Sequence, residues 1–212
     1  KPVVLVLLGG SALAVNYADE HASAIPEAWY PGARGGEAVA RALFGETNPQ
    51  GKLPVTFYHS DRDLPEFTDY AMKGRTYRYM EKEALYPFGY GLSYTTYKYS
   101  PVKLSESTMK KGGKITASAT ITNTGSRDGD EIVEFYIHDR YASIVRPVKE
   151  LKGFQRIHLA KGESKTVSFD IDAATLSYYD ADGNSVLEPG DFDIMIGPSS
   201  QTVNTAVLKV TE

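Results

Sequence analysis

The second half of the chain consists mainly of short segments in which apolar and polar residues alternate. The clearest example is ITASATIT at residues 115–122, and residues 133–137 follow the same pattern. Similar segments occur at residues 151–159, 166–171, 192–196 and 206–210. A period of two indicates strands with one buried face. Six or seven such strands, separated by turn sequences over about 110 residues, predict an immunoglobulin-like β-sandwich. The chain has no Cys, so it lacks the Cys…Trp…Cys signature of a true immunoglobulin domain.

The first 58 residues have a different pattern, in which strand-like and helix-like pieces alternate as in α/β proteins. Residues 3–8, VVLVLL, predict a strand buried on both faces inside a parallel sheet. A helix is expected from Gly35, with Gly45 as its stop. Four apolar residues fall on one face of that helix: Ala38, Val39, Ala42 and Leu43.

The apolar strand at residues 3–8 needs neighbours on both sides, and the sequence that follows it offers too few. We therefore expect the chain to be the tail of a longer protein, cut inside a domain. The alternative is an edge strand at a mature N-terminus, although edge strands are rarely so uniformly apolar. The change of pattern predicts an α/β part over residues 1–96 and a β-sandwich over residues 97–212.

Composition and spacing exclude several classes of function. The net charge is −4 and the basic residues are scattered, which argues against a nucleic-acid partner or a polybasic membrane patch. The longest apolar run has only six residues, too few to span a bilayer. No two of the four His residues have metal-ligand spacing, and the lack of Cys removes thiolate sites. We expect no metal and no cofactor.

Three short motifs suggest chemistry, but their spacing favours structural roles. The glycine-rich turn at residues 32–36 matches neither a dinucleotide fingerprint nor a P-loop. Residues 180–184, DADGN, resemble half a calcium loop but place Gly too early, so a hairpin turn is favoured. His138 and His158 could be drawn into a Ser-His-Asp triad, yet no nucleophile elbow is present.

A Tyr-rich segment links the two halves, since eight of the fifteen Tyr residues lie between Tyr70 and Tyr99. Within it we select Arg75, Tyr77 and Tyr79 as candidate substrate-binding residues. Aromatic rings stack on the C–H faces of sugars, and guanidinium groups donate hydrogen bonds to hydroxyls. The same residue types are also typical of domain interfaces, so both interpretations stay open here.

Several longer stretches together resemble glycoside hydrolase family 3, in its C-terminal half. In the first half they are AWYPG (28–32), GGEAVA (35–40), LFGETNPQGKLPVTF (43–57) and YPFGYGLSYT (86–95). In the second half they are NTG (123–125), GDE (129–131), RPVKELKGF (146–154) and EPG (188–190). The resemblance implies the end of a three-layer α/β sandwich domain followed by a fibronectin type III-like domain. Ala33 and Arg34 depart from the usual family residues in what is expected to be a turn.

The resemblance implies an exo-acting, retaining β-glycosidase that acts on oligosaccharides. It also implies that both catalytic carboxylates lie outside these residues, so no catalytic residue is assigned here. The partner would be the N-terminal remainder of the same enzyme, with the catalytic barrel either before or after this chain. Residues 75–79 resemble the β-xylosidase branch more than the fungal β-glucosidase branch. The alternative is a non-catalytic module that binds carbohydrate or docks domains.

Overall fold

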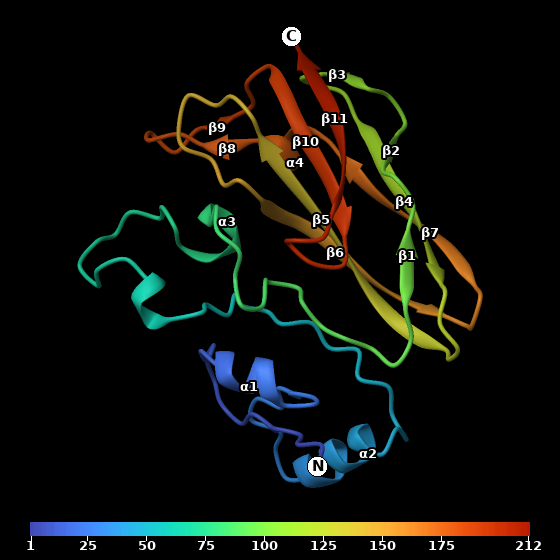
Figure 1. The fold of residues 1–212 in the computed structure, drawn as a ribbon. Coiled ribbons are helices and arrows are strands. Elements are labelled where there is room, and N and C mark those ends of the chain that lie inside the picture. Colours follow the sequence, from blue (N-terminus) through green and yellow to red (C-terminus); the bar gives the residue numbers. More distant parts are fainter.

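The computed structural model describes residues 1–212, and most of the regular secondary structure follows residue 96 (Figure 1). One sheet is formed by β1 (Tyr97–Tyr99), β2 (Lys103–Leu104), β4 (Ile115–Asn123) and β7 (Ser164–Ile171). The other has the order β3 (Thr108–Lys110), β11 (Asn204–Thr211), β10 (Gly190–Gly197), β5 (Gly129–Asp139) and β6 (Glu150–Leu159). All pairings within the two sheets are antiparallel except β3 with β11. Two layers of mainly antiparallel strands form the predicted sandwich.

The core lies between the two sheets because the alternating strands turn their apolar residues inward. On β4 every second residue from Ile115 to Asn123 is buried, while the Thr and Ser residues between them lie on the outer face. Phe135 of β5 and Phe169 of β7 stack across the core with ring centroids 4.9 Å apart. Nineteen buried residues form this cluster, and all of them follow residue 96. Burial of apolar surface therefore stabilises the sandwich far more than the preceding residues.

The DADGN motif at residues 180–184 forms the hairpin turn that its sequence favours. Residues 180–184 connect β8 (Tyr178–Tyr179) to β9 (Ser185–Val186), which pair antiparallel. The Asp180 carboxylate accepts hydrogen bonds from the backbone N–H groups of Asp182 and Asn184, at 3.0 and 2.8 Å. These donors hold the pKa of Asp180 below its usual value and close the turn.

The first half contains short helices and extended segments: α1 (Asn16–His21), α2 (Gly35–Leu43), a 3₁₀ turn (Asp61–Asp63) and α3 (Thr76–Tyr79). Helix α2 confirms the predicted helix, and Gly45 follows it with a φ of 75°. A further short helix, α4 (Ala173–Leu176), lies within the sandwich half. No helix of the protein combines the length and the apolar character needed to cross a membrane.

Residues 3–8 are extended and pair in parallel with residues 24–27, as the sequence predicted for this segment. Isolated bridges join Val4 to Ala24 and Leu7 to Glu27. Within this chain the segment has a partner on one side, and Val3 and Leu8 are 59% and 64% exposed. The burial on both faces that the sequence predicts is therefore not reached within these residues.

Two extended segments, residues 51–57 and 86–91, pair with each other, and we call them the strap. Leu53 donates its N–H to the Tyr90 carbonyl and Gly89 donates to the Leu53 carbonyl, each at 2.8 Å. Phe57 and Tyr86 exchange backbone hydrogen bonds at the other end. The strap passes between the α1 and α2 region and the sandwich, and the loop that carries α3 extends from it (Figure 1). It therefore positions this loop relative to the sandwich.

Candidate substrate-binding loop

The loop that carries the candidate residues has a strained backbone at its centre. Gly74 has a φ of 75°, and the next-but-one residue, Thr76, has a φ of 54°. A β-branched residue rarely adopts a positive φ, because its branched side chain clashes with the backbone. Two side chains hold this conformation: the Tyr58 hydroxyl accepts from the Thr76 N–H at 2.6 Å, and Thr56 Oγ1 accepts from the Tyr77 N–H at 3.1 Å. Strain of this kind is concentrated at functional sites.

Arg75 closes the loop on itself. Its Nε donates to the Ala71 carbonyl at 3.1 Å, and another guanidinium nitrogen donates to the carbonyls of Asp69 and Glu66. Three of its five donors are thereby directed at backbone carbonyls. In this conformation Arg75 fixes the shape of residues 66–75.

Tyr77 packs between the strap and the sandwich. Its ring stacks on Phe88 of the strap at 4.5 Å and meets Tyr136 of β5 edge-on at 5.8 Å. Burial raises the pKa of the Tyr77 hydroxyl above its usual value. The ring therefore joins the loop to both neighbouring parts of the molecule.

Tyr79 is half-buried, and its hydroxyl makes no hydrogen bond within the chain. The neighbouring Arg78 attaches this part of the loop to the sandwich, because its carbonyl accepts from the Val148 N–H at 2.8 Å. The Arg78 guanidinium also lies 3.7 Å from Glu150. The Tyr79 hydroxyl thus differs from the Arg75 guanidinium, which bonds to backbone carbonyls, and from the Tyr77 hydroxyl, which interacts with the Leu151 backbone.

A shallow pocket of about 260 Å³ opens where this loop meets the sandwich. Its wall includes Thr56, Tyr77, Met80, Lys82, Lys149 and Ser200. Burial lowers the pKa of Lys149, which donates a hydrogen bond to the Ser200 carbonyl. The structure thus places Tyr77 on the pocket wall, whereas Arg75 and Tyr79 do not line it. Lys149 was not among the predicted site residues. The sequence feature that could have indicated it is its position within RPVKELKGF, one of the stretches that resemble the family.

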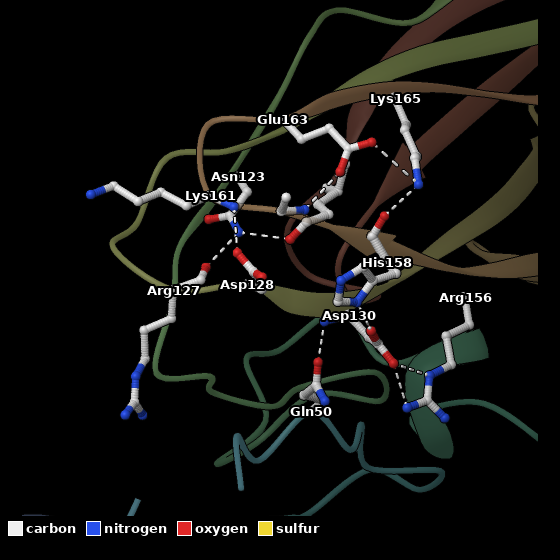
Figure 2. A network of polar contacts seen from close by, with 12 residues as sticks. Gln50, Asn123, Arg127, Asp128, Asp130, Arg156, His158, Lys161, Glu163 and Lys165 are labelled. Atoms are coloured by element: carbon white, nitrogen blue, oxygen red, sulfur yellow. Dashed lines mark hydrogen bonds and ion pairs between the residues drawn. The ribbon is translucent and has the colours of Figure 1, made fainter. Parts of the chain in front are cut away.

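The two histidines considered for a triad contact no Ser nucleophile. His138 Nδ1 lies 2.9 Å from the Pro147 carbonyl, and His158 Nδ1 lies 2.7 Å from Asp130. Figure 2 shows that Asp130 also pairs with Arg156, at 2.5 Å. The hydrogen bond from His158 and the Arg156 guanidinium hold the pKa of Asp130 below its usual value. This cluster ties β5 to β6 at one end of the sheet.

Comparison with known proteins identifies the two parts of the chain. Residues 1–94 match the glycosyl hydrolase family 3 C-terminal domain, and residues 131–200 match the fibronectin type III-like domain. These matches confirm the predicted α/β part followed by a β-sandwich. The chain belongs to glycoside hydrolase family 3 and corresponds to a C-terminal region of it.

Relatives in this family match nearly the whole chain. A periplasmic β-glucosidase of Salmonella typhimurium is 46% identical, with 96% of this chain and 28% of the relative covered. A β-xylosidase of Formosa agariphila is 43% identical, with 100% of this chain and 30% of the relative covered. The structure of a β-glucosidase from Erythrobacter marinus superimposes with a TM-score of 0.89 at 38% identity, covering 98% of this chain and 28% of that one. The chain therefore spans less than a third of the length of these relatives.

Proposed function

We propose that this chain is the C-terminal part of an exo-acting, retaining β-glycosidase that removes terminal β-linked glucose or xylose from oligosaccharides. The observation that carries the proposal is the match along 94–100% of the chain, at 42–46% identity, to four relatives named as β-glucosidase or β-xylosidase. A retaining mechanism needs two carboxyl groups roughly 5 Å apart, one as nucleophile and one as acid and base. We place both groups in the remainder of the enzyme.

We propose that this remainder, which precedes the chain, is its partner. Large apolar side chains are exposed on the first half, where a neighbouring domain could cover them. They include Val3, Leu8, Phe44, Phe67 and Tyr70, of which Phe67 is 94% exposed. We also propose a boundary after residue 96, because the strands of the sandwich begin at Tyr97. Neither a nucleic acid nor a membrane is part of the proposal.

Activity assays test the proposed function directly. The 212-residue chain alone is expected to leave p-nitrophenyl β-glucoside and β-xyloside unhydrolysed, because it lacks the carboxylate pair. The complete enzyme is expected to hydrolyse at least one of them, and the faster substrate assigns the branch. Turnover by the chain alone would contradict our placement of the carboxylates. Carbohydrate binding without activity in the complete protein would favour a non-catalytic module.

We propose that the Tyr-rich loop over residues 70–86 borders the leaving-group subsite, with Tyr79 as a sugar contact and Arg75 and Tyr77 as substrate-binding residues that also shape the loop. The strained Thr76 and the unpartnered Tyr79 hydroxyl support this assignment.

In the complete enzyme, Tyr79→Phe is expected to raise KM severalfold with little change in stability, because it removes only the hydroxyl. The expected loss corresponds to one hydrogen bond, about 1 kcal/mol. Tyr77→Ala is expected to raise KM as well, but also to lower the melting temperature, because it removes the stack on Phe88. Steady-state kinetics and thermal unfolding measure both effects. Unchanged kinetics in both variants, with only stability reduced, would make the loop an interface.

A further inference from the structure

Two buried carboxylates are associated with a single ammonium group where the strap crosses the sandwich. Glu131 and Glu134 of β5 are each only 4% exposed. Lys52 of the strap lies 3.4 Å from Glu131, and its side chain is 11% exposed. Glu134 forms no ion pair with any residue of the chain. Burying an unpaired carboxylate is costly, and a buried carboxyl group of this kind tends to retain its proton.

The backbone of the strap lies directly against Glu134. A Cβ atom added to Gly89 would stand 2.2 Å from Glu134 Oε2, so only a glycine permits this approach. The hydrogen-bond partner of the Glu134 carboxyl is the Tyr136 hydroxyl. Tyr136 also contacts Tyr77, and Tyr77 stacks on Phe88, the residue before Gly89. Glu134 is thus enclosed by the strap and connected through rings to the candidate loop.

Five titratable groups lie close enough to Glu134 to interact with its charge, although Glu131 shares the inward alternation of Val133 and Phe135. They are Glu131 and Tyr136 on β5, Lys52 on the strap, Tyr99 on β1 and Tyr77 on the loop. Tyr99 donates its hydroxyl to Glu131 at 2.7 Å. Burial raises the pKa of both carboxyl groups, that of Glu134 to about 7. With two carboxyl groups and one ammonium, a single proton on Glu134 makes the cluster neutral.

We propose that the protonated Glu134 carboxyl is a latch that holds the strap on the sandwich, and that its ionisation releases the strap together with the attached loop. The proposal goes beyond the proposed glycosidase function and does not depend on it. The junction between residues 1–96 and the sandwich over residues 97–212 would thereby respond to pH.

The sign of the pH dependence follows from proton binding. When the strap opens, Glu134 meets water and its pKa returns to about 4.3. Between that value and the raised native value, the closed form holds a proton that the open form has lost. Opening therefore becomes more favourable as pH rises through this window, by up to tenfold per pH unit. Above the native pKa the effect levels off.

Amide hydrogen exchange of the 212-residue chain tests the latch. The reporters are the Ser200 and Val148 amides of the sandwich half, which donate across the junction to the Phe88 carbonyl of the strap at 2.9 Å and to the Arg78 carbonyl of the attached loop at 2.8 Å. Amides of the β10–β11 pairing serve as the internal reference. After correction for intrinsic exchange, the protection factors of the reporters are expected to fall at least tenfold between pH 5 and pH 7. Glu134→Gln is expected to abolish this fall, because its amide stays neutral and can still accept from Tyr136.

A second variant distinguishes the latch from a general loss of folding. Glu131→Gln removes the neighbouring negative charge and leaves the Lys52 ammonium to stabilise the Glu134 carboxylate. The fall in the protection factors is therefore expected to move to lower pH. A direct titration of the Glu134 side-chain carboxyl by ¹³C NMR is expected to show a midpoint well above 4.3. A midpoint near 4.3, constant protection in the native chain, or the same fall in Glu134→Gln would each overturn the proposal.

Discussion

Replacing Asn123 by Ala is expected to lower the free energy of unfolding of the sandwich by about 3–4 kcal/mol. Asn123 is fully buried and its amide makes four hydrogen bonds. Nδ2 donates to the carbonyls of Arg127 and Leu159, at 2.7 and 3.1 Å (Figure 2). Oδ1 accepts from Thr95 Oγ1 and the Gly125 N–H, at 2.6 and 3.1 Å. Each bond contributes about 1 kcal/mol, and alanine leaves all four partners without Asn123, including the buried Thr95 hydroxyl and Leu159 carbonyl.

Urea unfolding followed by far-ultraviolet circular dichroism measures this effect. Asn123→Asp is a sharper probe, because its carboxylate would face two carbonyl oxygens while keeping the shape of the side chain. It is expected to destabilise at least as strongly at neutral pH. The control is the adjacent Thr122→Val on the outer face, which removes a single exposed hydrogen bond to Ser164, so a loss of about 1 kcal/mol or less is expected. Equal effects at Asn123 and Thr122 would show that the four hydrogen bonds of the Asn123 amide do not stabilise the sandwich as expected.

Phe135→Ala is expected to cost about 3–5 kcal/mol, because it removes a large ring from the middle of the core. The Phe135 ring is 2% exposed and stacks on Phe169 from the opposite sheet. Phe135→Leu keeps most of the volume and is expected to cost about 1–2 kcal/mol. Phe154, on the neighbouring strand β6, is 65% exposed and provides the matched control. Phe154→Ala should change stability little, and a similar loss at both positions would contradict the assigned core.

The strands and helix α2 were predictable because each carries its own periodicity. Residues 115–122 alternate without exception, and the buried face of β4 follows that alternation. The candidate loop was not predictable in the same way. Tyr and Arg serve sugar sites and interfaces equally well, and the Tyr77 contacts with Phe88 and Tyr136 depend on residues up to 59 positions away.

The Glu131 and Glu134 cluster shows the same limit more clearly. Alternation with Val133 and Phe135 places Glu134 on the outer face of β5, where a charged residue would ordinarily meet water. The structure covers that face with the strap, which comes from a distant part of the chain. Burial of Glu134 therefore depends on tertiary packing, and the sequence around Glu134 contains no local pattern that predicts its burial.

The strap has a consequence for exchanging parts between relatives of this family. A crossover placed after residue 96 would keep the sandwich strands together but separate Thr95 from Asn123 and Lys52 from Glu131. Gly89 would also be separated from the Glu134 side chain that requires it. A functional chimera must therefore inherit the strap and the sandwich from the same parent. Residues 51–57 and 86–96 should therefore be inherited together with the sandwich that they contact, although they precede it in the chain.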